Sequence, residues 1–150
     1  MSYLVDTNVL LRSVQISHPM HSDAAGSIDL FLRGGEEVSI ISQNLIEFWA
    51  VATRPEVSNG LGISINQTVQ IIAAFKNAFL LLPDTVSIFA EWEQLVARHR
   101  VAGKQVYDAR LVAAMNVHKV THLLTFNTAD FKRYSGITVV SPSSVKGSGR

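Results

Sequence analysis

The chain has 150 residues, 47% of them hydrophobic and 17% charged, a composition typical of one globular domain and not of a disordered protein. Its formal net charge is +1, so bulk charge does not indicate a nucleic-acid partner, and such a ligand would need a local basic patch. It contains no cysteine, which excludes disulfides, a thiol nucleophile and thiolate metal sites.

No stretch of the sequence indicates a membrane segment. The longest apolar runs, such as residues 78–82, are too short to cross a bilayer. Met1 is followed directly by residues typical of a core strand, without the basic and apolar regions of a signal peptide. We therefore expect a cytoplasmic protein that does not contact a membrane.

Hydrophobic periodicity predicts short strands that alternate with helices. The expected strands are residues 3–5, 37–41, 79–82, 121–125 and 137–140. The first expected helix starts near residue 9. The other expected helices cover about residues 20–33, 44–53, 64–76, 85–100 and 107–118. This alternation predicts a mostly parallel sheet covered on both faces, that is, a three-layer α/β domain over residues 1–142. Residues 143–150, rich in Ser and Gly, are predicted to form a flexible C-terminal tail.

Polar residues that precede two of the expected helices are predicted to be N-caps. Ser42 follows the second strand and is placed to cap the next helix, and Asp84 or Thr85 is placed to cap the helix that ends near residue 100. These assignments give the three side chains a structural role only.

Four acidic residues lie at or near strand–helix junctions, and we single them out as candidate site residues: Asp6, Glu47, Asp108 and Asp130. Each one alone is explained as well by a helix cap or by a favourable interaction with the helix dipole. Asp108 begins a helix whose Leu111 and Val112 face the core, so its side chain is expected to point inward.

Taken together, the four acids indicate a metal site. Ligands bind at the carboxyl ends of strands in α/β sheets, and carboxylates that converge there repel one another unless a cation neutralises them. Oxygen ligands without cysteine suit Mg²⁺ or Mn²⁺, and one or two such ions can activate water for phosphodiester hydrolysis. Small polar groups that could orient the acids or a bound phosphate are Thr7, Asn8, Thr125 and Asn127.

The sequence resembles PIN-domain ribonucleases, in particular the VapC-like toxins of prokaryotic toxin–antitoxin pairs. The resemblance rests on LVDTNVL at residues 4–10, Glu47, YDARLVAA at 107–114 and LTFNTADF at 124–131. It implies a PIN-like α/β/α fold and divalent-metal binding by Asp6, Glu47 and Asp108. Asn127 and Asp130 both compete for the fourth position, and we favour Asp130 because it is charged.

The resemblance further implies a metal-dependent endoribonuclease, a toxin that a cognate antitoxin protein neutralises and that often forms a homodimer. Arg110, two residues after Asp108, is expected either to contact the RNA backbone or to pair with a neighbouring acid. A receiver domain or a haloacid-type phosphatase would need a second acid close to Asp6, where Asn8 stands instead. The remaining alternative is a PIN-like module that binds RNA or protein without cleaving it.

Overall fold

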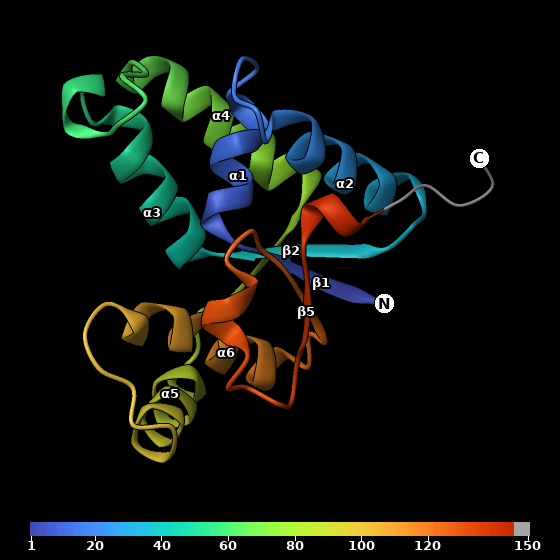
Figure 1. The fold of residues 1–150 in the computed structure, drawn as a ribbon, viewed down its shortest axis with the longest axis vertical. Helices are drawn as coiled ribbons and strands as arrows, with labels where there is room; N and C mark the ends of the chain where they lie inside the picture. Colours follow the sequence, from blue (N-terminus) through green and yellow to red (C-terminus); the bar gives the residue numbers. More distant parts are fainter. Residues whose placement is uncertain (146–150) are drawn as a thin grey trace.

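A parallel sheet between two layers of helices forms the molecule in the computed structural model, which describes residues 1–145 (Figure 1). Its five strands lie in the order β3-β2-β1-β4-β5, and every neighbouring pair is parallel. The strands are β1 (Ser2–Val5), β2 (Glu37–Ile41), β3 (Leu80–Leu82), β4 (His122–Leu124) and β5 (Thr138–Val140). The predicted three-layer α/β fold is confirmed.

Four helices cover one face of the sheet and two cover the other (Figure 1). The larger layer consists of α1 (Thr7–Val14), α2 (His21–Arg33), α3 (Ser42–Thr53) and α4 (Ile65–Ala78). The smaller layer consists of α5 (Val86–Arg98) and α6 (Gln105–His118). Each layer has its own apolar core against the sheet. None of the helices in residues 1–145 is long and apolar enough to cross a membrane.

The side chains of β1 alternate between the two cores. Tyr3 and Val5 pack with α1 to α4, whereas Leu4 packs with α5 and α6. Because both faces of the sheet are covered, the strand is a continuous apolar run and not an alternation of apolar and polar residues.

The strand order changes direction beside β1. The chain builds β1, β2 and β3 outward to one side and then crosses to place β4 on the other side of β1. The backbone N–H of Asp6 donates to the carbonyl of Leu124 at 2.9 Å, so the carboxyl ends of β1 and β4 lie side by side. This switch point is where open α/β sheets bind their ligands.

The predicted caps at Ser42 and Asp84 are wrong. Helix α3 begins at Ser42 itself, and the side chain of Asn44 accepts a hydrogen bond of 2.9 Å from the backbone N–H of Ile41, which precedes the helix. Ser42 donates instead to a carboxylate oxygen of Asp84. Of the two alternatives predicted for α5, Thr85 occupies the N-cap position, but its side chain makes no capping bond.

A tight loop after α3 folds back on the end of that helix. It contains the short 3-10 helix η1 (Glu56–Ser58) and then Asn59, which has a positive φ of 65°. A Cβ atom on Gly60 would lie 1.9 Å from the carbonyl oxygen of Arg54, so this position requires glycine. Backbone packing in this loop thus accounts for the sequence around Gly60.

The last described residues pack on the domain. Pro142–Ser144 form the 3-10 helix η3, which contacts α2, and Val145 packs against the larger core. The predicted tail therefore includes residues that belong to the packed structure. The rest of that tail, residues 146–150, lies outside the described residues.

Candidate functional site

Asp6 lies buried at the carboxyl end of β1, with 7% of its surface exposed. Its Oδ1 accepts a hydrogen bond of 2.7 Å from the backbone N–H of Thr7. Its Oδ2 accepts one of 2.8 Å from the Thr125 hydroxyl and one of 3.4 Å from the Asn8 side-chain amide. The carboxylate is thus held in place from both β1 and β4.

These hydrogen bonds only partly offset the cost of burying a charge at Asp6. The pKa of Asp6 is raised to about 7, mainly by burial and also by the negative charges of Asp108 and Glu47. The hydrogen bonds from Thr125 and Thr7 act in the opposite direction and lower the pKa. The charges that act on Asp6 are negative, so they add to the cost of ionising this buried carboxylate and do not offset it.

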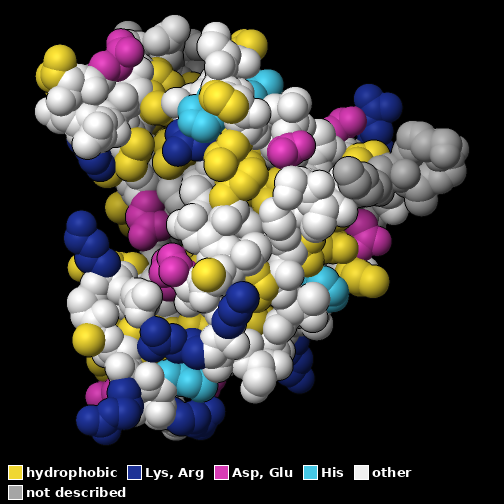
Figure 2. Space-filling model, viewed as in Figure 1, with side chains coloured by type: hydrophobic (Ala, Val, Ile, Leu, Met, Phe, Trp, Pro, Cys, Tyr) yellow, Lys and Arg dark blue, Asp and Glu magenta, His cyan; other side chains and the backbone are white. Residues whose placement is uncertain are grey.

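Asp108 lies half-buried in the first turn of α6. Burial raises the pKa of Asp108 to about 6, with further contributions from the charges of Asp130 and then Glu47. Asp108 in turn acts on the pKa of Asp6, so the charges of Asp108 and Glu47 act on Asp6, and those of Asp130 and Glu47 act on Asp108. Figure 2 shows acidic side chains gathered in a hollow between the two helix layers.

Both carboxylate oxygens of Glu47, on α3, are hydrogen-bonded. Its Oε1 accepts a hydrogen bond of 2.8 Å from the Thr7 hydroxyl, and its Oε2 accepts one of 3.3 Å from Nε2 of Gln43. Buried Asn44 donates to the same Thr7 hydroxyl at 3.4 Å. Thr7 therefore links Glu47 to the turn that carries Asp6.

Asp130 lies in the 3-10 helix η2 (Thr128–Phe131), exposed and with its charge acting on Asp108. The exposed Asn127 is held through its backbone N–H, which donates to the Thr125 hydroxyl at 3.0 Å. The choice of Asp130 over Asn127 and the role of Asp130 as a metal ligand stay predictions.

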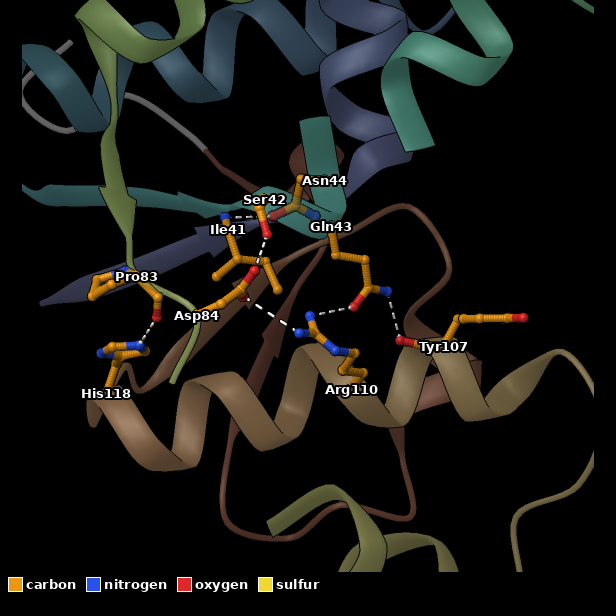
Figure 3. A network of polar contacts seen from close by, with 9 residues as sticks. All are labelled: Ile41, Ser42, Gln43, Asn44, Pro83, Asp84, Tyr107, Arg110 and His118. Atoms are coloured by element: carbon orange, nitrogen blue, oxygen red, sulfur yellow. Dashed lines mark hydrogen bonds and ion pairs between the residues drawn. The ribbon is translucent and has the colours of Figure 1, made fainter. Parts of the chain in front are cut away.

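Arg110 pairs with an acid, one of the two roles expected for it. Its Nη2 lies 3.4 Å from Oδ1 of Asp84, and its Nη1 donates to Oε1 of Gln43 at 3.1 Å (Figure 3). These residues line a cavity of about 310 Å³ together with Glu47 and Tyr107. The guanidinium group thus borders the site without contacting Asp6 or Asp108 in the described structure.

The donor set fits a hard divalent cation, since carboxylates and hydroxyls without cysteine prefer Mg²⁺ or Mn²⁺. The uncompensated charge of Asp6 and its repulsion from Asp108 are what a cation would relieve. Within residues 1–145, no three His, Asp or Glu side chains already surround one ion position. Mg²⁺ usually keeps several waters and is held by one or two carboxylates, so a complete cage of protein ligands is not needed.

Three residues near the site were not among the predicted site residues: Gln43, Asn44 and Asp84. Gln43 precedes Glu47 by four positions, a spacing that places both side chains on one face of a helix and could have indicated the contact. Nothing in the sequence pattern marks the contacts of Asn44 and Asp84, because their partners are distant in the chain.

Comparisons with known proteins agree with the fold. The model of the PIN domain family matches residues 3–137. The curated protein Ribonuclease VapC24 of Mycobacterium tuberculosis is 25% identical over 139 residues, which cover 92% of this chain and 94% of the relative.

Solved structures with the same fold include VapBC2 from Rickettsia felis bound to a promoter DNA fragment. The TM-score is 0.71 at 14% sequence identity, and the match covers 94% of this chain and 98% of that one. VapC20 of Mycobacterium tuberculosis, described as a sarcin–ricin-loop-cleaving toxin, has a TM-score of 0.67, 17% identity and coverage of 90% and 96%. The predicted resemblance is confirmed: the chain belongs to the PIN domain family.

Proposed function

We propose that this protein is a metal-dependent endoribonuclease that hydrolyses RNA phosphodiester bonds. The observation that carries the proposal is the electrostatically coupled set of four acids at the switch point of the sheet, in which Asp6 is buried and interacts with Asp108. A relative that covers nearly the whole chain is named a ribonuclease, which supports RNA as the substrate.

Mg²⁺ or Mn²⁺, one or two ions, would be held by four acids: Asp6, Glu47, Asp108 and Asp130. When bound, such an ion lowers the pKa of a coordinated water and stabilises negative charge on the scissile phosphate. Asp6 and Asp108 must be ionised to bind a cation, and their raised pKa values place this step in the neutral range.

The polar neighbours of the acids orient the carboxylates. The Thr125 hydroxyl and the Thr7 backbone N–H hold the two oxygens of Asp6, and the Thr7 hydroxyl holds Glu47, so Thr7 keeps the two acids in a fixed relation. Asn8 donates to the hydroxyl of Thr125 at 3.3 Å and supports the same arrangement. Asn127 lies at the rim and is the remaining candidate for a phosphate contact.

A protein antitoxin is the partner that we propose for this chain. The support is that neighbours with the same fold were solved as VapBC complexes from Rickettsia felis and Salmonella typhimurium. A homodimer, expected from the family resemblance, is proposed with it.

The proposal is tested by incubating the purified full chain with a pool of structured RNAs in Mg²⁺, Mn²⁺ or EDTA. Asp6→Asn and Asp108→Asn remove one charge each, and Asp23→Asn, an exposed acid on α2, is the matched control. We expect cleavage by the wild type and Asp23→Asn in Mg²⁺ or Mn²⁺, and none in EDTA or with the two site variants.

Two results would contradict the proposal. Equal cleavage by the wild type and both site variants would assign the activity to a contaminant or to other residues. Mn²⁺ binding to the wild type without cleavage of any RNA would favour the non-catalytic RNA- or protein-binding module. That alternative has one observation in its favour, because no three acids surround a common ion position in residues 1–145.

A further inference from the structure

Gln43 connects the helix that carries Glu47 to the helix that carries Asp108. Its Nε2 donates a hydrogen bond of 3.3 Å to Oε2 of Glu47 and one of 2.9 Å to the backbone carbonyl of Tyr107. Tyr107 directly precedes Asp108 in the first turn of α6. Figure 3 shows the Gln43 side chain reaching from α3 to α6. One amide group therefore bridges the two helices that carry these acids.

Arg110 determines which end of the Gln43 amide faces Glu47. A guanidinium group has donors only, so its Nη1 can pair with the amide oxygen, Oε1, and not with the amide nitrogen. The nitrogen is left to face Glu47 and the Tyr107 carbonyl, and its two hydrogens match these two acceptors. A reversed amide would lose all three hydrogen bonds and turn its oxygen toward a carboxylate.

Arg110 is itself held in position by the loop before α5. Its Nη2 pairs with Oδ1 of Asp84 at 3.4 Å, and the other oxygen of Asp84 accepts a hydrogen bond from Ser42. Ser42 lies next to Gln43 at the start of α3. The contacts thus close a ring from α3 through the loop and α6 back to α3 (Figure 3).

The carboxylate of Glu47 is held from two sides. The Thr7 hydroxyl binds its Oε1 at 2.8 Å from the end of β1, where Asp6 lies, and Gln43 binds its Oε2 from the α6 side. With the Thr7 contact alone, the carboxylate could rotate about its last torsion, which is broad for glutamate. The Gln43 contact restricts that rotation.

We propose that Gln43 is a positioning residue that sets the direction of the Glu47 carboxylate and its spacing from Asp108. The proposal rests on the metal-dependent function proposed above. Partners that orient metal ligands typically change metal affinity by about 10- to 100-fold when they are removed. Gln43 acts through Glu47, so its contribution disappears when Glu47 can no longer bind a cation.

The test measures Mn²⁺ affinity of the full chain by calorimetric titration for Gln43→Met, which keeps the length and helix propensity of the side chain. The same substitution is made in a Glu47→Gln background, and the exposed Gln94→Met on α5 is the matched control. We expect an affinity loss of about 10-fold in the wild-type background, less than about 2-fold in the Glu47→Gln background, and none for the control. Thermal unfolding of each metal-free variant shows whether it is folded, and Gln43→Ala replaces any Gln43→Met protein that is not.

Three outcomes would overturn the inference. If folded Gln43→Met bound Mn²⁺ with wild-type affinity, Gln43 would not position a ligand. The proposed nuclease function would still stand in that case if the wild type binds Mn²⁺ and cleaves RNA. An equal loss in both backgrounds would show that Gln43 acts independently of Glu47. Absence of both Mn²⁺ binding and RNA cleavage in the wild type would instead remove the proposed function, and this inference with it.

Discussion

The hydroxyl of Thr125 donates a hydrogen bond of 2.8 Å to Oδ2 of Asp6 across 119 positions of the chain. Thr125 is fully buried, and its hydroxyl also accepts hydrogen bonds from Asn8 and from the backbone of Asn127. This contact joins the ends of β1 and β4, so one hydroxyl organises the point at which the two sides of the sheet meet.

Thr125→Val is expected to destabilise the protein most at high pH. The substitution keeps the shape and removes the donor, and a hydrogen bond to a charged group contributes about 1.5–3 kcal/mol. At about pH 8 Asp6 is ionised and the full loss applies, whereas at about pH 5 its raised pKa keeps it protonated and the loss is smaller. Urea unfolding at both pH values measures the difference, with Thr125→Ser as the control that retains the hydroxyl. A loss of the same size at both pH values would argue against the charged contact.

Asp6→Asn is expected to stabilise the metal-free protein at about pH 8. The pKa of Asp6 is about 7 in the folded chain and 3.8 in its ordinary state, so the folded protein holds the proton more tightly than the unfolded one. Stability therefore falls as pH rises from about 4 to about 7 and stays low above that range. Removing the charge should recover up to about 4 kcal/mol at about pH 8 and little at about pH 4.

Chemical unfolding of metal-free Asp6→Asn against pH provides the measurement, and Asp23→Asn should retain the wild-type profile. A variant less stable than the wild type at about pH 8 would show that the buried charge is compensated in solution. The same variant should lose RNA cleavage, so that stability and activity change in opposite directions.

Mn²⁺ is expected to raise the thermal unfolding temperature of the wild type at about pH 8. Ligand binding to the folded state adds about 2.7 kcal/mol when the free ligand is at about 100 times its Kd. Protons compete for Asp6 and Asp108, whose pKa values are raised to about 7 and about 6, so the effect should weaken as pH falls below about 6. Thermal scans with Mn²⁺ or EDTA test this, and Asp108→Asn should show a much smaller rise. An equal rise in Asp108→Asn would place the ion elsewhere.

Gly60→Ala is expected to destabilise the protein by about 2 kcal/mol or more, because its Cβ would overlap the carbonyl oxygen of Arg54. Gly26, in the middle of α2, has no atom within 4 Å of an added Cβ. Gly26→Ala should therefore stabilise the helix by about 0.5–1 kcal/mol. Urea unfolding of both variants provides the comparison, and two effects of the same sign would contradict the packing argument.

The fold was predictable from the sequence because the central strands of the sheet are buried on both faces. Leu4 packs on one core and Val5 on the other, so the strand is an uninterrupted apolar run that ends at Asp6. The helix starts were less accurate. Helix α3 begins at Ser42, two residues before the predicted start, because Asn44 accepts a hydrogen bond from the residue before the helix. A cap made from within the first turn has a weaker sequence signal than one made by the preceding residue.

The candidate site was predictable where an acid follows a strand, as with Asp6, or lies in the first turn of a helix, as with Asp108, although α6 begins at Gln105 and not at the predicted residue 107. The polar residues that support the site were not predictable from the sequence. Asp84 has the sequence position of a helix cap, yet its carboxylate binds Ser42 and Arg110, residues 42 positions before it and 26 after it. Such contacts depend on how the helices pack, and hydrophobic periodicity contains no information about them.

The placement of β4 beside β1 has a consequence for the protein while it is being synthesised. Asp6 and Glu47 precede Asp108, Thr125 and Asp130 in the chain, and β4, which Thr125 follows directly, is synthesised after β1, β2 and β3. Domains fold as units once their chain has emerged, so β4 can insert beside β1 only after residues 122–124 have left the ribosome. Under the proposed activity, a chain that has not yet formed β4 therefore lacks an assembled nuclease centre.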